Sequence, residues 1–190
     1  QDVLNQYHRQ NPLHAGIQSA ELRQKLCKGM ERSCADALIA ILHREGKIRK
    51  PGDRYALSDF TVTLTKRQRG IREKLMAVYS TAGIETPITE HVMEGFPSNE
   101  RGEAKQVLES LLTSGELVLL TPQICLYRKD YAKILEATKK HFEDNDSLTL
   151  AQLRDMLNTS RKYAQALVEY FDKIHITKKD GDIHYLDQGF

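Results

Sequence analysis

The sequence is poor in the residues that mark disulfide-rich, metal-binding and membrane proteins. Its 190 residues include no Trp and only 3 Cys, and its apolar runs are a few residues long. Cys27, Cys34 and Cys125 are irregularly spaced, without a CxxC pair or a Cys/His cluster. We therefore expect free thiols in a reducing cytoplasm, and no disulfide framework, metal site or membrane-spanning helix.

Signals for targeting and for catalysis are also lacking. The chain starts at Gln1 without an apolar signal segment, and we interpret it as a fragment or a mature piece. It has no G-x-x-x-x-G-K-[ST] loop for nucleotide phosphates, no paired carboxylates and no nucleophile with a spaced base, and its 7 His are scattered. We expect no enzymatic activity and no cofactor.

The charge of the chain gives only a weak indication of its partner. Its net charge is +2, which by itself does not identify a nucleic-acid-binding protein. Residues 1–58 hold 10 Lys and Arg against 6 Asp and Glu, whereas the rest of the chain is close to neutral. A surface that binds anions would therefore be a local patch and not a field over a whole domain.

The strongest feature is a pattern that occurs three times. The copies are "ADALIAILHREGKIRKPGDRYAL", "EAKQVLESLLTSGELVLLTPQICLY" and "YAQALVEYFDKIHITKKDGDIHYL". Each has apolar residues at helical spacing around one small Ala, which predicts a buried helix face. The equivalent positions are Ala35, Ala104 and Ala164; Leu38, Val107 and Leu167; Ile39, Leu108 and Val168; and Leu42, Leu111 and Tyr170.

A turn and a hairpin follow each of these helices. Gly46 and Gly115 suit a left-handed residue after a helix, whereas the third copy has no Gly there, so we expect its helix to end differently. The turns "KPGDR", "TPQ" and "KDGD" each separate two short strands. A second helix precedes each copy, and in the third copy Thr149 and Gln152 are spaced as a capping box.

Three helices closed by a two-stranded wing form a winged-helix domain. We therefore predict a mostly helical α+β chain, a tandem array of three winged helices over residues 1–60, 61–130 and 131–190. No Gly/Ser-rich or Pro-rich linker separates the copies. The connections are short, so we expect the copies to dock on one another.

The third copy has cations at both ends of its helix–hairpin segment. Arg161 and Lys162 fall in the first turn after a cap at Asn158, Thr159 or Ser160, where the helix dipole disfavours positive charge. The hairpin turn holds a second pair, Lys178 and Lys179. Since a winged helix places both ends on one side, these four cations are candidates to flank a phosphate backbone. The alternative is that they are solvated residues on an exposed end.

Other residues near this end have two possible roles each. Tyr163 is available either to stack on an unpaired base or to pack at the helix–wing junction. Asp182 either forms the turn or accepts a hydrogen bond from a base, and Arg154 either contacts phosphate or pairs with Asp155 or Asp172. The first copy has a basic wing that is a candidate secondary contact, for instance with the ribosome, or a simple soluble turn. Its cations are Lys47, Arg49, Lys50 and Arg54.

The third copy closely resembles the last winged helix of SelB, the family of bacterial selenocysteine-specific elongation factors. The resemblance covers a G/S-R-K-x-A start, an L-E-Y-x-D-R/K-I middle and a T-R/K-R/K-x-G-D/N end, and His175 replaces the usual Gly. The matching residues are Ser160, Arg161, Lys162, Ala164, Glu169, Tyr170, Asp172, Lys173, Ile174, Thr177, Lys178, Lys179, Gly181 and Asp182. The opening segment "YHRQNPLHAGIQSAELRQKL" is similar to the start of an earlier SelB winged helix, and the middle copy matches only in pattern.

The resemblance implies that this chain holds the last three of four winged helices. In that family the last one grips the loop of an mRNA hairpin, the SECIS element, while GTP is bound by other domains. The cations of the third copy would then hold the RNA backbone. We therefore expect a cytoplasmic monomer that binds the SECIS hairpin and does not bind a membrane. A DNA-binding regulator and a scaffold that binds only proteins are the alternatives.

Overall fold

The computed structural model describes residues 2–29 and 31–188, which divide into two compact units. The first unit runs to Arg69 and the second starts at Gly70. The division falls inside α4 (Lys66–Thr81). Helices and small antiparallel sheets alternate in the order expected for winged helices, so the predicted α+β class and tandem array are confirmed.

The first unit contains one winged helix closed by a three-stranded sheet. Its strands are antiparallel in the order β1-β3-β2, and the sequence pattern did not indicate β1. A cluster of buried apolar side chains joins the helices to this sheet, with Leu22 and Ile39 at its helical face. The elements are α1 (Asp2–Gln10), β1 (Ile17–Gln18), α2 (Ser19–Cys27), α3 (Arg32–Arg44), β2 (Ile48–Arg49) and β3 (Arg54–Leu57).

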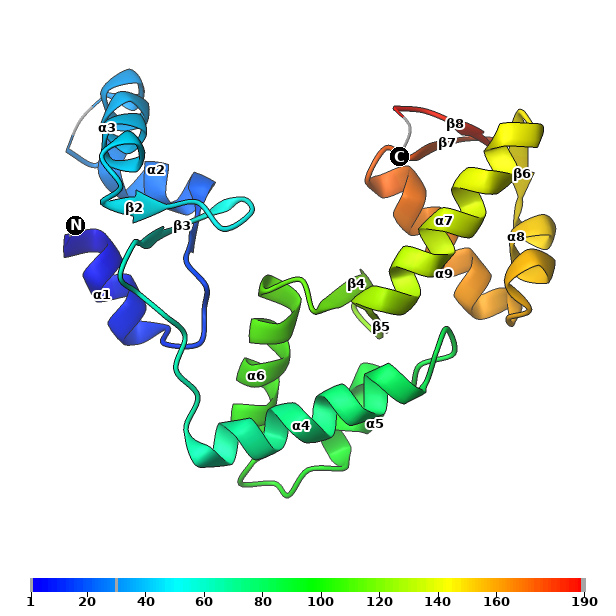
Figure 1. Ribbon diagram of the computed structural model, residues 1–190, viewed down its shortest axis with the longest axis horizontal. Coiled ribbons are helices and arrows are strands. Elements are labelled where there is room, and N and C mark those ends of the chain that lie inside the picture. Colours follow the sequence, from blue (N-terminus) through cyan, green and yellow to red (C-terminus); the bar gives the residue numbers. More distant parts are fainter. Residues whose placement is uncertain (1, 30, 189–190) are drawn as a thin grey trace. The chain divides into compact units, whose positions relative to one another are not determined.

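The second unit contains the other two winged helices (Figure 1). The middle one has a two-stranded wing, whereas the last one has a sheet in the order β6-β8-β7. After α4, the middle copy continues with α5 (Thr89–Glu94), α6 (Arg101–Thr113), β4 (Leu117–Thr121) and β5 (Ile124–Tyr127). The last copy comprises α7 (Arg128–Asp144), β6 (Ser147–Thr149), α8 (Leu150–Leu157), α9 (Arg161–Lys173), β7 (Thr177–Asp180) and β8 (Ile183–Leu186).

One hydrophobic cluster joins the wing of the middle winged helix to the last winged helix. Side chains of the middle wing, including Val118 and Leu126, belong to the same buried cluster as Leu167 and Phe171 of α9. Strand β4 packs directly against α9. The wing of the middle copy is therefore used to bind its neighbour, and the expected docking of the copies holds between these two.

The buried face predicted from the repeat is present in all three copies. Ala35, Ala104 and Ala164 are each 0% exposed. The capping box is also confirmed, since Thr149 and Gln152 exchange the two hydrogen bonds that define it. These contacts fix the start of α8, which forms one wall of the site described below.

The end of α9 corrects one expectation. Gly46 and Gly115 adopt the predicted left-handed conformation, with φ of 69° and 76°, and His175 does the same with φ of 61°. In each copy the same pair of backbone hydrogen bonds closes the helix; in the last copy His175 donates to Asp172 and Ile176 to Phe171. The third helix therefore ends as the others do, and a non-glycine residue carries the conformational strain.

Candidate nucleic-acid interface

Helix α9 begins at a cap supplied by the middle winged helix. The N-cap residue is Ser160, and its own side chain makes no capping bond. Instead, the carboxylate of Glu85 accepts hydrogen bonds from the Ser160 N–H at 2.7 Å and from the Thr159 hydroxyl at 3.0 Å. These bonds hold the pKa of Glu85 below its usual value. Glu85 thus acts in trans as the Glu of a capping box does within one helix.

Tyr163 does not have the stacking role that was one of its two predicted uses. Its side chain is buried, at 9% exposure, and its hydroxyl donates to the carbonyl oxygen of Thr86. Burial, together with the negative charge of Glu85, raises the pKa of this phenol. Tyr163 therefore fastens α9 to the segment between α4 and α5, so it packs at a junction between domains and not at its own wing.

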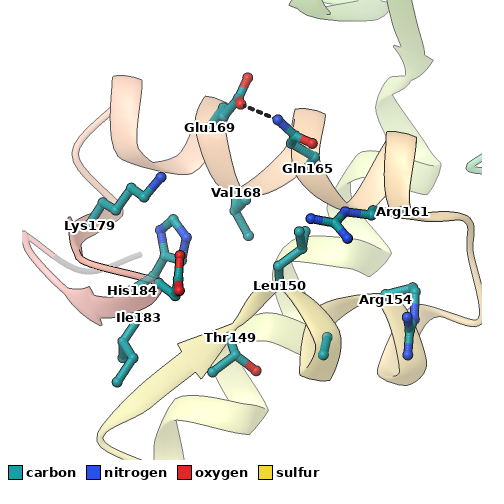
Figure 2. Close-up of a pocket in the computed structure, with 12 residues that line it drawn as sticks. Thr149, Leu150, Arg154, Arg161, Gln165, Val168, Glu169, Lys179, Ile183 and His184 are labelled. Carbon is teal, nitrogen blue, oxygen red and sulfur yellow. Dashed lines mark hydrogen bonds between the residues drawn. The ribbon is translucent and has the colours of Figure 1, made fainter.

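A cavity of about 460 Å³ opens between α8, α9 and the wing of the last copy. Figure 2 shows Arg161 and Lys179 extending towards this space from α9 and β7. Arg154 and Asp182 also line it, so four of the predicted site residues meet in one cavity. Half of the remaining lining is an apolar wall, formed by Leu150, Ala151, Val168 and Ile183. The other half is polar: Thr149, Gln165, Glu169 and His184.

Lys178 is the predicted cation that the fold separates from the others. In a strand, successive side chains point to opposite faces. Lys179 pairs with the buried His184 on the cavity side, whereas Lys178 pairs with Tyr185, which is 42% exposed. The predicted group of four cations around one backbone is therefore wrong for Lys178, because the alternation of β7 turns it to the other face of the wing.

Arg161 and Lys162 also border a second depression, of about 640 Å³. Its opposite side is the wing turn of the middle copy, residues 121–124. Both cations are exposed, and the ammonium nitrogen of Lys162 lies 5.3 Å from the centre of the Tyr163 ring. Arg161 thus borders both the cavity and the second depression.

The cavity contains acidic groups as well as cations. Arg154 pairs with Asp155 at 2.7 Å, which was one of its predicted roles, while its side chain still reaches the cavity. Glu169 accepts a hydrogen bond from Gln165 at 2.9 Å (Figure 2). Such a mixture of donors and acceptors is suited to a ligand that carries both phosphate and base edges.

His184 is a cavity residue that sequence reasoning missed. Its Nδ1 lies 3.1 Å from Oδ1 and 3.0 Å from Oδ2 of Asp172, and Thr177 donates to the same carboxylate at 2.6 Å. His184 belongs to none of the motifs described above, and Asp172 was noted only in the family resemblance and as a possible partner of Arg154. Asp172 on α9 and His184 on β8 are 12 residues apart and come together only in the fold, so no local pattern indicated their contact.

The basic wing of the first copy makes contacts within its own unit. Arg49 donates to the Phe60 carbonyl at 2.9 Å, and Arg54 donates to the Gly16 carbonyl at 3.2 Å. Lys47 pairs with Glu45 at 2.8 Å, and the Lys50 ammonium lies 5.6 Å from the ring of Tyr55. Lys47 and Lys50 are exposed, so these two are the cations most open to a partner.

The described residues hold neither a metal-binding cluster nor a membrane-spanning helix. Within residues 2–29 and 31–188, no group of three or more His, Cys, Asp or Glu side chains is arranged to hold a metal ion. In the same part of the chain, no helix combines the length and the apolar character needed to cross a membrane.

Both ends of the chain are similar to domains of one known family. Residues 1–57 and 140–186 each match a family described as elongation factor SelB, winged helix. A selenocysteine-specific elongation factor from Desulfomicrobium baculatum is 27% identical over 181 residues, which cover 95% of this chain and 28% of that protein. The chain thus spans little more than a quarter of that relative.

A solved structure has a similar fold. It is the mRNA-binding domain of elongation factor SelB from E. coli in complex with SECIS RNA. The TM-score is 0.56 and the identity 20%, over 66% of this chain and all of that one. At this identity, the comparison establishes the shared winged-helix fold.

Proposed function

Because this chain carries winged-helix domains of the SelB family at both ends, we propose that it is the part of a selenocysteine-specific elongation factor that binds the SECIS hairpin of an mRNA. It tethers the factor to the message and has no catalytic role of its own. The observation that carries the proposal is the cavity of the last winged helix, which Arg161, Lys179 and Arg154 line together with an apolar wall.

The cavity suits the loop of a hairpin better than a duplex. Its cations can neutralise phosphates where the backbone bends, and its apolar wall can hold the face of an unstacked base. Sequence-specific reading of RNA mostly targets such unstacked loop bases. Glu85 already occupies the N–H of Ser160, so the grip on phosphate falls mainly to side chains and less to the helix N-terminus.

The other parts of the chain support this binding site. We divide it into winged helices over residues 1–60, 61–130 and 131–190, of which the last binds RNA. Ser160 and Lys162 extend the interface towards the second depression, and the exposed cations Lys47 and Lys50 offer a secondary contact with the ribosome. The protein acts as a monomer in the cytoplasm, and GTP is handled outside this chain.

Two neighbouring lysines provide a matched test of the proposal. Lys178→Ala and Lys179→Ala remove the same charge from the same strand, but only Lys179 lines the cavity. RNA hairpins with a fixed stem and a randomised loop are enriched for binding to the chain. The affinity of the selected hairpin is then measured against salt concentration by fluorescence anisotropy.

We expect Lys179→Ala to reduce the salt dependence by about one unit of slope, and Arg161→Ala to weaken binding by roughly 1–3 kcal/mol. Lys178→Ala should change both quantities much less. A duplex DNA of the same length is the control and should bind more weakly than the hairpin. Equal losses for the two lysines, or equal affinity for hairpin and duplex, would contradict the proposal.

A further inference from the structure

His184 is an almost buried residue that faces the cavity and has no role in the grip on phosphate described above. It lies on β8, and only 4% of it is exposed. It nevertheless lines the cavity together with Lys179 and Arg161 (Figure 2). A polar ring at the border of a binding cavity has one of two roles. It either stabilises the fold (a fastening role) or recognises a chemical group of the ligand (a reading role), and its hydrogen bonds distinguish the two.

The carboxylate of Asp172 fixes the imidazole of His184 in one tautomer. Both oxygens of Asp172 lie within 3.1 Å of Nδ1, and the Thr177 hydroxyl holds the same carboxylate in place. A carboxylate oxygen can only accept, so the proton of a neutral imidazole is on Nδ1. The other ring nitrogen, Nε2, then keeps a lone pair and is a hydrogen-bond acceptor.

This acceptor is left free for a ligand. Among the residues that the structure describes, no hydrogen bond to Nε2 of His184 is found, and Nε2 is absent from the buried polar atoms without a partner, so it is open to the cavity. Aligned by Asp172, the ring points a single acceptor at whatever occupies the space.

The surroundings of His184 favour a base over a phosphate. Leu150, Val168 and Ile183 belong to the apolar wall of the same cavity, and none of these side chains can donate a hydrogen bond to a phosphate. A base has apolar faces and a polar edge, and the cations Arg161 and Lys179 are at hand for its phosphate. Asp182 and Glu169 also line the cavity, but neither is held in one orientation by burial as His184 is.

We infer that His184 is a specificity-determining residue, whose Nε2 accepts a hydrogen bond from an N–H group on the edge of one unstacked loop base. The inference rests on the proposed RNA-binding function and names a residue that reads sequence. It adds to the cations, which contact phosphate and therefore carry little sequence information.

Two substitutions separate the reading role from the fastening role. In His184→Asn the amide takes the place of Nδ1, keeps a hydrogen bond to Asp172, and lacks the atom that faces the ligand. In His184→Gln the amide reaches the position of Nε2 and loses the bond to Asp172. A purely structural role would make the Gln variant the worse of the two, whereas a reading role makes the Asn variant the worse one.

The experiment repeats the loop selection with the wild-type chain and with both variants, after circular dichroism has confirmed that each is folded. We expect the wild-type chain to require a particular base at one loop position. His184→Asn should bind the hairpin selected with wild type about tenfold more weakly and lose that requirement. His184→Gln should keep part of the requirement. Replacing that nucleotide by an abasic one should weaken wild type but hardly affect His184→Asn further.

Other outcomes overturn the inference. If His184→Asn keeps the loop preference of wild type, or if the losses from the abasic nucleotide and from His184→Asn simply add, then His184 does not read the base. If the wild-type chain bound no hairpin better than a duplex, that result would instead refute the proposed function itself. The two failures are therefore distinguishable, because the first requires a hairpin that wild type binds.

Discussion

At the scale of single residues, the buried imidazoles of His184 and His8 have different hydrogen-bond surroundings. His184 has a carboxylate beside its Nδ1, at 3.0 Å. His8, in the first unit, is 5% exposed and stacks on Phe60 with ring centres 3.6 Å apart. Its Nε2 accepts from the Leu57 N–H at 3.3 Å, whereas its Nδ1 is buried without a partner. Nδ1 of His184 therefore has a hydrogen-bond partner, whereas Nδ1 of His8 is buried without one.

The environment of His8 predicts that acid weakens the first unit. Burial and the positive charge of Arg49 lower the pKa of His8, while Asp59 has a smaller, opposite effect. The unfolded chain then binds more protons than the folded one between the lowered pKa and the ordinary value of about 6.5. The stability that neutral His8 supplies is complete above about pH 6.5 and is lost as the pH falls through the folded-state pKa.

Hydrogen exchange of α1 and β3, followed by mass spectrometry at about pH 8 and about pH 5 after correction for intrinsic rates, measures this effect. We expect reduced protection at the lower pH in the wild-type chain. In His8→Gln the amide oxygen takes the place of Nε2, still accepts from Leu57 and does not titrate. In this variant the protection of α1 should depend little on pH. If the pH dependence were as large as in wild type, groups other than His8 would cause the acid sensitivity.

At the scale of elements, the end of α9 shows a conformational cost that the other two copies avoid. His175 adopts φ of 61° where the equivalents are Gly46 and Gly115. A side chain in this region costs about 1–2 kcal/mol relative to glycine in the folded state, which is partly offset by the greater freedom of glycine in the unfolded chain. The His175 side chain contributes little stability to set against this cost. It is largely exposed, and its contact with Asp187 is long, at 3.4 Å.

We therefore expect His175→Gly to stabilise the second unit by about 0.5–1 kcal/mol. Urea denaturation monitored by circular dichroism gives the change in the midpoint at constant slope. The reciprocal control is Gly115→Ala, at a site where an added Cβ meets no atom within 4 Å, so that only the backbone conformation is tested. That variant should be less stable than wild type, and a stabilised Gly115→Ala would show that φ is not the cause.

The helical repeat and its buried Ala positions followed from the sequence, because spacing along one helix is a local property. The short strands β1 and β6 did not, since two or three residues show no period, and they form only when β3 and β8 supply hydrogen bonds. The cap on α9 was missed for a similar reason. Glu85 and Ser160 are 75 residues apart, and no local pattern connects them.

In the candidate site, too, local patterns were predictable from the sequence and contacts between distant residues were not. The cations of α9 were identifiable because they stand at a predicted helix start, and the wing lysines because they flank a predicted turn. Which of the wing lysines faces the cavity depends on the register of β7 with β8, which a one-residue shift would reverse. His184 and Tyr163 acquire their roles from partners on other elements, so their residue types alone left those roles open.

At the scale of the whole molecule, the hydrophobic cluster of the first unit and the one around α9 have no residue in common. One joins the helices and sheet of the first unit, and the other joins the wing strands of the middle winged helix to the last winged helix. A shared core makes two domains unfold together, because neither can lose its packing without exposing the other. The middle and last winged helices should therefore behave as one cooperative unit, separate from the first.

Removing a side chain from the shared core tests this coupling. Leu126, on β5 of the middle winged helix, is fully buried in that cluster. We expect Leu126→Ala to destabilise the second unit by roughly 2–5 kcal/mol, and to reduce hydrogen-exchange protection in α9 as much as in α6. The matched control is Leu22→Ala in the core of the first unit, which should affect α3 and leave α9 unchanged. If Leu126→Ala exposed α6 while α9 kept its protection, the last winged helix would be stable on its own, and its RNA site would not depend on the middle one.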